Sequence, residues 1–229
     1  MGETNELVLS TLKRTSRTTA DWAGCLFFCA FAITIPLTSG SSGLLLLPPM
    51  LYEVAVAATF LLRNRARRSL QGLMPRLISY VATFFLPLFI WIAIRWIPSF
   101  FTITQSPLLR TAGASFWLFG TVLSFWPIWY MRRSFSIEPA ARELATKGPY
   151  RIARHPIYAT QLLEYLGIWM LHATVAFAAA LVGWLIIVRV RMRYEEQVLR
   201  DVFPEYASYQ QRVGAFGPRL RPVLAMSGE

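Results

Sequence analysis

Lys147-Gly-Pro-Tyr-Arg-Ile-Ala-Arg-His-Pro-Ile-Tyr158 is a short polar and cationic stretch between two strongly apolar segments. Gly148 and Pro149 interrupt regular structure, and Pro156 favours the start of a helix directly after His155. Polar groups held at the edge of a membrane are costly, and they usually line a site. We therefore take this stretch as the candidate active site. An arginine-rich loop that only anchors a helix among lipid headgroups is the competing interpretation.

The composition of the chain is that of a polytopic membrane protein. Of its 229 residues, 55% are hydrophobic and only 15% are charged, unlike an ordinary soluble domain. A single membrane domain, residues 1–229, suits this length. The formal net charge is +11, and because the cations cluster between apolar runs, we assign them to membrane lipids and not to nucleic acid. The only cysteines, Cys25 and Cys29, have no further ligands nearby in the sequence, so we expect no metal site.

Hydropathy predicts about six membrane-spanning helices in an all-α protein. Only three residues separate the short fifth run from the sixth, so these two should form a tight helical hairpin. A cleaved signal peptide is the competing interpretation of the first run. The predicted spans are residues 22–37, 44–62, 77–97, 108–131, 157–171 and 175–188.

The placement of arginine and lysine supports this arrangement. The two tails and alternate loops hold 21 of the 23 cations, whereas the loops at 38–43, 98–107 and 172–174 hold none. By the positive-inside rule, the candidate site and both termini are cytoplasmic. A five-span arrangement would break the pattern. The 21 arginines against two lysines indicate a GC-rich bacterial source, so we expect the bacterial inner membrane.

A second polar cluster follows the sixth predicted span. Its members are Arg189, Arg191, Arg193, Glu195 and Glu196. Ion pairs along one helix explain part of it, since Arg191 and Glu195 are four residues apart. A simple anchor does not need two adjacent carboxylates beside anionic lipids. Because a hairpin joins the two clusters, we expect them to enclose a pocket, with cations on one wall and carboxylates on the other.

The C-terminal part of the chain is amphipathic. Beyond the sixth predicted span, apolar and aromatic residues recur every three or four positions, which predicts a cytosolic helical segment. Pro204 should divide it into two helices. The recurring residues are Tyr194, Val198, Val202, Tyr206, Tyr209 and Val213.

Two stretches of the chain resemble a known enzyme family. Residues 145–158, with Leu162 and Gly167, are similar to the signature of isoprenylcysteine carboxyl methyltransferases and their bacterial relatives. The later Arg191 and the Glu195–Glu196 pair fit that family's C-terminal pattern. The resemblance covers residues 140–220, which would form the catalytic region. Residues 1–135 resemble the family only in being apolar transmembrane helices.

The resemblance implies S-adenosylmethionine as the methyl donor, held in a cytosol-facing pocket. Arg191 and Glu196 would lie where methyl transfer occurs, with Arg191 orienting the acceptor. Arg189 and Arg193 are further candidates for contact with the substrate. The implied cofactor-binding residues are Lys147, Tyr150, Arg154, His155, Pro156, Tyr158, Glu195 and Glu196.

Two acidic residues lie inside predicted spans, and each is costly in hydrocarbon. Glu164 falls about two turns beyond Pro156 on the fifth span, and Glu53 lies in the second. Structural pairing inside the protein would explain both. Recognition of a substrate headgroup is the alternative, and it makes Glu164 a candidate substrate-binding residue.

The methyl acceptor is the least constrained part of the prediction. The family name suggests the carboxylate of an isoprenylcysteine-like lipid that enters from the bilayer, while a lipid amine or a small thiol stays open. An NADPH-dependent membrane reductase of similar helical architecture is a second class, although the Glu195–Glu196 pair would repel a 2′-phosphate. A non-catalytic membrane scaffold is a further class, but in such a protein the two polar clusters would have no function. The sequence leaves the oligomeric state open.

Overall fold

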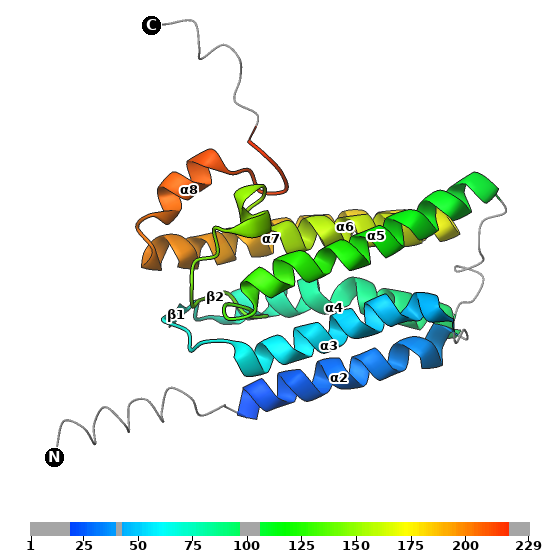
Figure 1. Cartoon of the computed structure of the whole chain (residues 1–229), viewed down its shortest axis with the longest axis horizontal. Coiled ribbons are helices and arrows are strands. Elements are labelled where there is room, and N and C mark those ends of the chain that lie inside the picture. Colours follow the sequence, from blue (N-terminus) through cyan, green and yellow to red (C-terminus); the bar gives the residue numbers. More distant parts are fainter. Residues whose placement is uncertain (1–18, 40–42, 97–105, 220–229) are drawn as a thin grey trace, which may run out of the picture.

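The computed structural model describes residues 19–39, 43–96 and 106–219. Within these ranges the chain is almost entirely helical (Figure 1), as predicted, apart from one two-stranded antiparallel sheet. The helices are α2 (Thr19–Ser39), α3 (Leu47–Leu62), α4 (Leu73–Trp96), α5 (Pro107–Met131), α6 (Pro156–His172), α7 (Val175–Val202) and α8 (Tyr206–Arg212). The 3-10 turns are η1 (Leu44–Leu46) and η3 (Gly148–Arg151), and the strands are β1 (Arg68–Ser69) and β2 (Ala140–Ala141).

Three of the described helices are long and apolar enough to cross a membrane. They are α4 over residues 73–93, the whole of α5, and α7. The apolar segments of α2 and α3, Asp21–Pro36 and Leu47–Leu62, are shorter. The count of six spans therefore stays a prediction. Both chain ends, residues 1–18 and 220–229, lie outside the described residues, as does most of the predicted loop at 98–107.

Helices α5 and α6 pack closely because glycine lies at their contact. A Cβ added at Gly167 would lie 2.3 Å from the backbone nitrogen of Trp117, and one at Gly120 would lie 2.8 Å from that of Glu164. Side chains of any size at these positions would force the two backbones apart. The close contact fixes the position of α6, which carries the C-terminal end of the candidate stretch.

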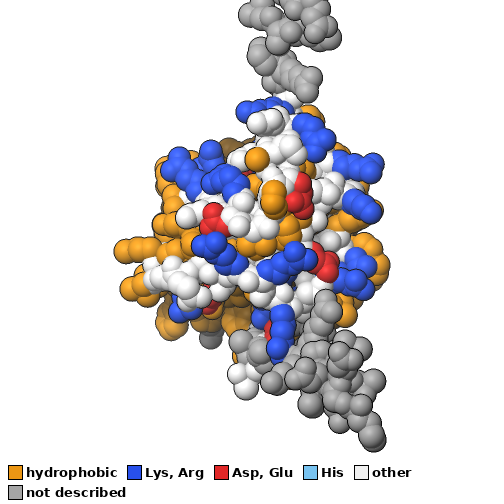
Figure 2. Space-filling view, turned by 90° about the vertical axis from the view of Figure 1, so that its left-hand side faces the viewer, with side chains coloured by type: hydrophobic (Ala, Val, Ile, Leu, Met, Phe, Trp, Pro, Cys, Tyr) orange, Lys and Arg blue, Asp and Glu red, His pale blue; other side chains and the backbone are white. Residues whose placement is uncertain are grey.

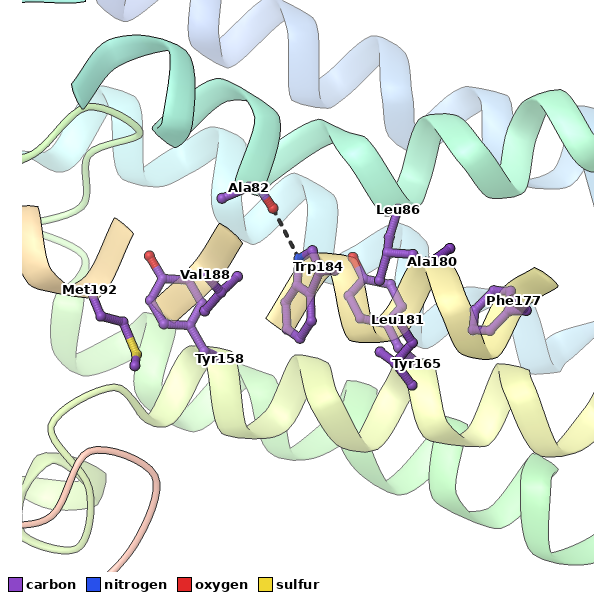
Figure 3. Close-up of a cluster of buried hydrophobic side chains, with 10 residues drawn as sticks. All are labelled: Ala82, Leu86, Tyr158, Tyr165, Phe177, Ala180, Leu181, Trp184, Val188 and Met192. Atoms are coloured by element: carbon purple, nitrogen blue, oxygen red, sulfur yellow. Dashed lines mark hydrogen bonds between the residues drawn. The ribbon is translucent and has the colours of Figure 1, made fainter. Parts of the chain in front are cut away.

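Helices α6 and α7 follow one another with only Ala173 and Thr174 between them. Ala173 has a left-handed φ of 50°, and the Thr174 hydroxyl caps α7 by accepting the amide of Phe177 at 3.3 Å. The structure differs from a tight hairpin, however, because α6 packs mainly on α5 and α7 mainly on α4. Figure 3 shows the buried cluster among α4, α6 and α7, in which the Trp184 indole donates to the carbonyl of Ala82 at 3.0 Å.

The C-terminal half of α7 continues well past the predicted end of the sixth span. The helix runs unbroken to Val202, so the first part of the predicted amphipathic segment belongs to α7. Pro204 lies in the break before α8, as predicted. The extension of α7, α8, the small sheet and η3 gather at one end of the helix bundle (Figure 1). Lysine and arginine side chains are spread over this end face (Figure 2).

Candidate active site

The candidate stretch is held at the polar end of the bundle by backbone contacts. Gly148 has a φ of +58°, and a Cβ there would lie 2.5 Å from the Tyr130 ring, so the position requires glycine. The amides of Arg154 and His155 donate to the carbonyls of Gly214 and Ala215 at 2.8 and 2.9 Å. The residues that follow α8 therefore hold the stretch in place just before α6 begins.

Glu196 on α7 is the centre of one half of the site. Its Oε1 accepts from Arg154 Nε at 2.9 Å and lies 3.0 Å from His155 Nε2. Its Oε2 accepts from Gln210 Nε2 of α8 at 2.7 Å. The side chain of Glu196 is only 7% exposed, and its charge is tolerated there because partners from three segments of the chain surround it.

Glu195 is the centre of the other half. Its Oε1 accepts from the Tyr158 hydroxyl at 2.6 Å and from Arg191 Nε at 2.9 Å. Its Oε2 lies 3.5 Å from His155 Nδ1. The imidazole of His155 thus lies between the two carboxylates and faces each with one ring nitrogen.

The two carboxylates control the charge of His155. Burial by itself would lower the pKa of this imidazole, but hydrogen bonds and charge from Glu195 and Glu196 outweigh burial and raise the pKa above its ordinary value of 6.5. A protonated ring satisfies both neighbours at once, since both nitrogens then donate. The network therefore favours the imidazolium form.

Arg191 is buried and held by groups outside its own helix. One terminal nitrogen donates to the Thr83 hydroxyl at 2.6 Å and to the Ser79 carbonyl at 3.1 Å, both on α4. The other donates to the Ile137 carbonyl at 2.8 Å. All three guanidinium nitrogens therefore already have protein acceptors. Arg191 joins α7 to α4 and to the segment after α5, and its predicted part in orienting the acceptor stays a prediction.

Two cavities meet at this network. The first, the membrane cavity, extends among the apolar helices and is lined by aromatic residues of α2 and α4, by Glu53 and Glu164, and by Tyr158 and Arg191. The second, the loop cavity, lies among the segments at the polar end and is lined by Glu138, Glu143, Leu144, Leu199, Tyr206 and Tyr209. Both are lined by Met131, Ser136, Tyr150, Arg154, His155 and Glu195.

Tyr150 and Tyr209 form a fixed part of the wall of the loop cavity. Burial raises the pKa of Tyr209 to about 12, so its hydroxyl stays protonated at neutral pH. It donates to the Tyr150 carbonyl at 2.6 Å. This bond joins α8 to η3 across the cavity.

The structure brings together most of the predicted site residues. Tyr150, Arg154, His155, Pro156, Tyr158, Arg191, Glu195 and Glu196 converge, and Glu164 lines the membrane cavity. Lys147, Arg189 and Arg193 are exposed and line neither cavity. Their roles stay predictions, with no contact in the structure to support them.

The expected separation of charges onto opposite walls is wrong. Cations and carboxylates hydrogen bond to one another directly and form a single shared wall between the two cavities. The reason is the continuous helix of α7, which carries Arg191 and both glutamates into the start of α6.

Sequence reasoning missed several members of the network. Gln210 lies in the amphipathic segment, where no pattern distinguishes it. Ser79 and Thr83 did leave a signal, because they are small polar residues four apart, on one face of an otherwise apolar run. In the ranges that the structure describes, no group of three or more His, Cys, Asp or Glu residues could hold a metal ion.

Comparison with known proteins supports a methyltransferase. Residues 108–206 match the model of the phospholipid methyltransferase family. A cobalt-zinc-cadmium resistance protein, CzcN, of Cupriavidus metallidurans is 34% identical over 116 residues, 50% of this chain and 51% of that protein. A nickel-cobalt-cadmium resistance protein, NccN, of Alcaligenes xylosoxydans xylosoxydans is 34% identical over 79 residues, 34% of this chain and 37% of that protein. The matches thus span about half the length of these curated relatives or less.

The family match begins and ends earlier in the chain than the region 140–220, in which the resemblance was predicted. It begins in α5, ahead of residue 140, and ends at the first residue of α8. It contains the candidate stretch and the Glu195–Glu196 pair, but not Gln210 or the contacts from α4. Over residues 108–206, the chain is therefore similar to the phospholipid methyltransferase family, which agrees with the membrane methyltransferase that its sequence resembles.

Proposed function

We propose that this protein transfers a methyl group from S-adenosylmethionine to a lipophilic acceptor held in the membrane cavity. One observation carries the proposal. The loop cavity at the charged end of the bundle and the membrane cavity among its helices share the wall formed by Tyr150, Arg154, His155 and Glu195. A water-soluble donor and a lipid can therefore approach the same few atoms from two sides.

The residues of the loop cavity fit the donor. S-adenosylmethionine carries a sulfonium and an ammonium against one carboxylate, so it is a net cation at neutral pH. Glu138, Glu143 and Glu195 line the cavity and favour a cation there. Leu144 and Leu199 offer apolar surface to the adenine. When bound, the cofactor would supply an activated methyl group.

The protein's own part is to position the reactants and to exclude water. Glu195 is fixed at the shared wall by the Tyr158 hydroxyl and by Arg191, and Arg191 is in turn held by Thr83 and Ser79 of α4. Such a preorganised wall holds two reactants in line without reorganising during the reaction. The apolar surroundings keep water from competing with the acceptor.

The membrane cavity suits an acceptor with an apolar chain. Phe27, Phe28 and Phe31 of α2 lie opposite Phe84 and Pro87 of α4, and the rings of Phe27 and Phe84 are 5.2 Å apart. An isoprenylcysteine-like carboxylate is the acceptor that the resemblance implies, and carboxyl O-methylation would then be the reaction.

Calorimetry on the purified full chain in a non-ionic detergent tests this function. Saturable binding of S-adenosylhomocysteine and no binding of NADPH are expected. Because His155 lines both cavities and holds Glu195 and Glu196 in place, His155→Ala should weaken the first titration while far-UV circular dichroism stays unchanged. Binding of NADPH alone would instead support a reductase and overturn the proposal.

A further inference from the structure

A group of charged residues lies at the polar end of the bundle, outside both cavities. Arg63 follows the last residue of α3 and Asp21 lies in the first turn of α2, and their side chains form an ion pair of 2.7 Å between Nε and Oδ1. Arg142 directly follows β2, and its Nη1 donates to the carbonyl of Asn64. We call Asp21, Arg63 and Arg142 the arginine site. None of the three lines the membrane cavity or the loop cavity.

Arg142 lacks acceptors for most of its donors. Its Nε is buried and has no hydrogen-bond partner among the residues that the structure describes. Beyond the bond from Nη1 to Asn64, its side chain makes no hydrogen bond or ion pair in the described part of the chain. The neighbouring carboxylate of Glu143 accepts from the Asn64 amide instead and lines the loop cavity. Charged groups that are half-buried or buried are normally paired, so Arg142 lacks the partner that its position requires.

The charge of Arg142 is not neutralised within the arginine site. Asp21 is paired with Arg63, so the three side chains together carry a net positive charge. Burial and the charge of Arg63 lower the pKa of Arg142 to about 10, and Asp21 only partly opposes this shift. The guanidinium therefore stays charged at neutral pH. A water molecule could accept from its nitrogens, but only an anion would also neutralise the charge.

The arginine site lies at the level where lipid headgroups are expected. Trp22 in the first turn of α2 and Trp129 in the last turn of α5 are 53% and 64% exposed. Exposed tryptophan at the ends of apolar helices is typical of the boundary between hydrocarbon and headgroups. The amide of Asn64 donates to the carbonyl of Arg133 at 2.8 Å, so the end of α5 adjoins the site. Basic sites between transmembrane helices on the cytoplasmic side bind anionic lipid headgroups.

We infer that the arginine site binds the phosphate group of an anionic phospholipid. The two nitrogens of Arg142 without partners, Nε and Nη2, lie on one edge of the guanidinium, the edge that can bind a phosphate through two parallel hydrogen bonds. Nη2 is not buried, so a headgroup can approach this edge from outside. The acyl chains would lie against exposed apolar side chains nearby, such as Leu62 of α3. Because the site is outside both cavities, its lipid is not the methyl acceptor.

Two phospholipids with the same acyl chains test the site. Dioleoyl phosphatidylglycerol is anionic, whereas the choline group of dioleoyl phosphatidylcholine cancels the charge of its phosphate. Native mass spectrometry of the purified full chain in non-ionic detergent measures the affinity for the first bound lipid of each kind. The parent protein should bind phosphatidylglycerol at least about tenfold more tightly, a difference of about 1.4 kcal/mol. Equal affinities would overturn the inference.

Variants of single arginines localise the preference. Arg142→Gln should reduce the preference to about threefold or less. Arg142→Lys keeps the positive charge and should lose less of the preference, which separates loss of the charge from loss of the fold. Arg212→Gln removes one positive charge from an exposed position on α8 and should leave the preference intact. A preference that survives in Arg142→Gln, or that falls equally in Arg212→Gln, would overturn the inference.

Inorganic phosphate distinguishes a lipid from a soluble anion. Added to the same samples, it should leave the binding of phosphatidylglycerol nearly unchanged, because it lacks the acyl chains that hold a headgroup at the site. Displacement of the lipid by inorganic phosphate would assign the site to a soluble anion and overturn the inference. The measurements involve no S-adenosylmethionine, so their outcome is independent of the proposed function.

Discussion

At the scale of single residues, the site depends on one imidazole between two carboxylates. His155 faces Glu195 and Glu196 with its two nitrogens, while Arg154 and Arg191 each supply a further positive charge. In a buried setting, removing one partner of such contacts costs more than at the surface, because it leaves the others poorly compensated. Single substitutions should therefore have large effects.

Glu196→Gln removes the charge that Arg154, His155 and Gln210 share. We expect the affinity for S-adenosylhomocysteine to fall by at least about tenfold, because losing a buried charged partner generally costs well over 1 kcal/mol. Isothermal titration calorimetry measures the loss, and circular dichroism checks the fold. An unchanged dissociation constant would mean that Glu196 does not serve the cofactor site.

The raised pKa of His155 makes stability depend on pH. Because the folded-state pKa lies above the unfolded value of 6.5, the stabilisation is complete below pH 6.5 and is lost as pH rises through the folded-state pKa. The melting temperature of the parent should thus fall more between pH 6 and pH 9 than that of His155→Gln. Parallel pH profiles in the two proteins would show that His155 is neutral in the folded state.

At the scale of secondary-structure elements, close helix packing positions the catalytic region. Gly113, Gly120 and Gly167 allow α5 and α6 to approach at backbone distance. Helix α4 contributes in another way, since Ser79 and Thr83 accept from Arg191 and so connect α4 to α7. The glycine contacts between α5 and α6 and the Arg191 contacts to α4 both support the site from the side of the membrane helices.

Gly167→Ala should loosen the α5–α6 contact. The added methyl group would meet the Trp117 backbone, which cannot move aside as a flexible side chain can, and overpacking of this kind costs about 1–3 kcal/mol. Gly183→Ala is the matched control on α7, because its Cβ would have only the Phe85 ring nearby, at 3.9 Å. Thermal unfolding in detergent should show a lower melting temperature for the first variant only. Equal melting temperatures would contradict the packing argument.

At the scale of the whole molecule, lysine and arginine side chains gather at one end of an apolar bundle. Lysine and arginine cover the end face that carries α8 and the loop cavity (Figure 2). The positive-inside rule predicts that this end faces the cytoplasm, where the proposed soluble donor would be available. The lipophilic acceptor would reach the same site through the bilayer.

Cysteine labelling tests this orientation. With Cys25 and Cys29 replaced by alanine, Lys147→Cys and Val175→Cys introduce exposed thiols at opposite ends of the bundle. A membrane-impermeant maleimide should label the second variant in spheroplasts and the first only in inverted vesicles. Labelling of the Lys147→Cys variant in intact spheroplasts would reverse the orientation.

Local patterns in the sequence were sufficient for the elements and for the composition of the site. The apolar runs at 108–131 and 157–171 predicted α5 and α6 to within one residue, and Pro204 predicted the break before α8. Hydropathy, helix periodicity and proline act over a few residues, so one sequence reveals them. They also identified the two polar clusters that form the network.

Only the tertiary structure decided which charges meet. Arg154 and Glu196 are 42 residues apart, and Arg191 and Thr83 are 108 apart, so packing alone brings each pair together. The cations and carboxylates lie in one wall because α7 is unbroken. The hydropathy pattern predicted too early an end for this helix, since its polar half does not resemble a membrane span. That Glu53 and Glu164 line one cavity was likewise hidden, since the packing of α3 and of α6 on α5 depends on contacts that no local pattern encodes.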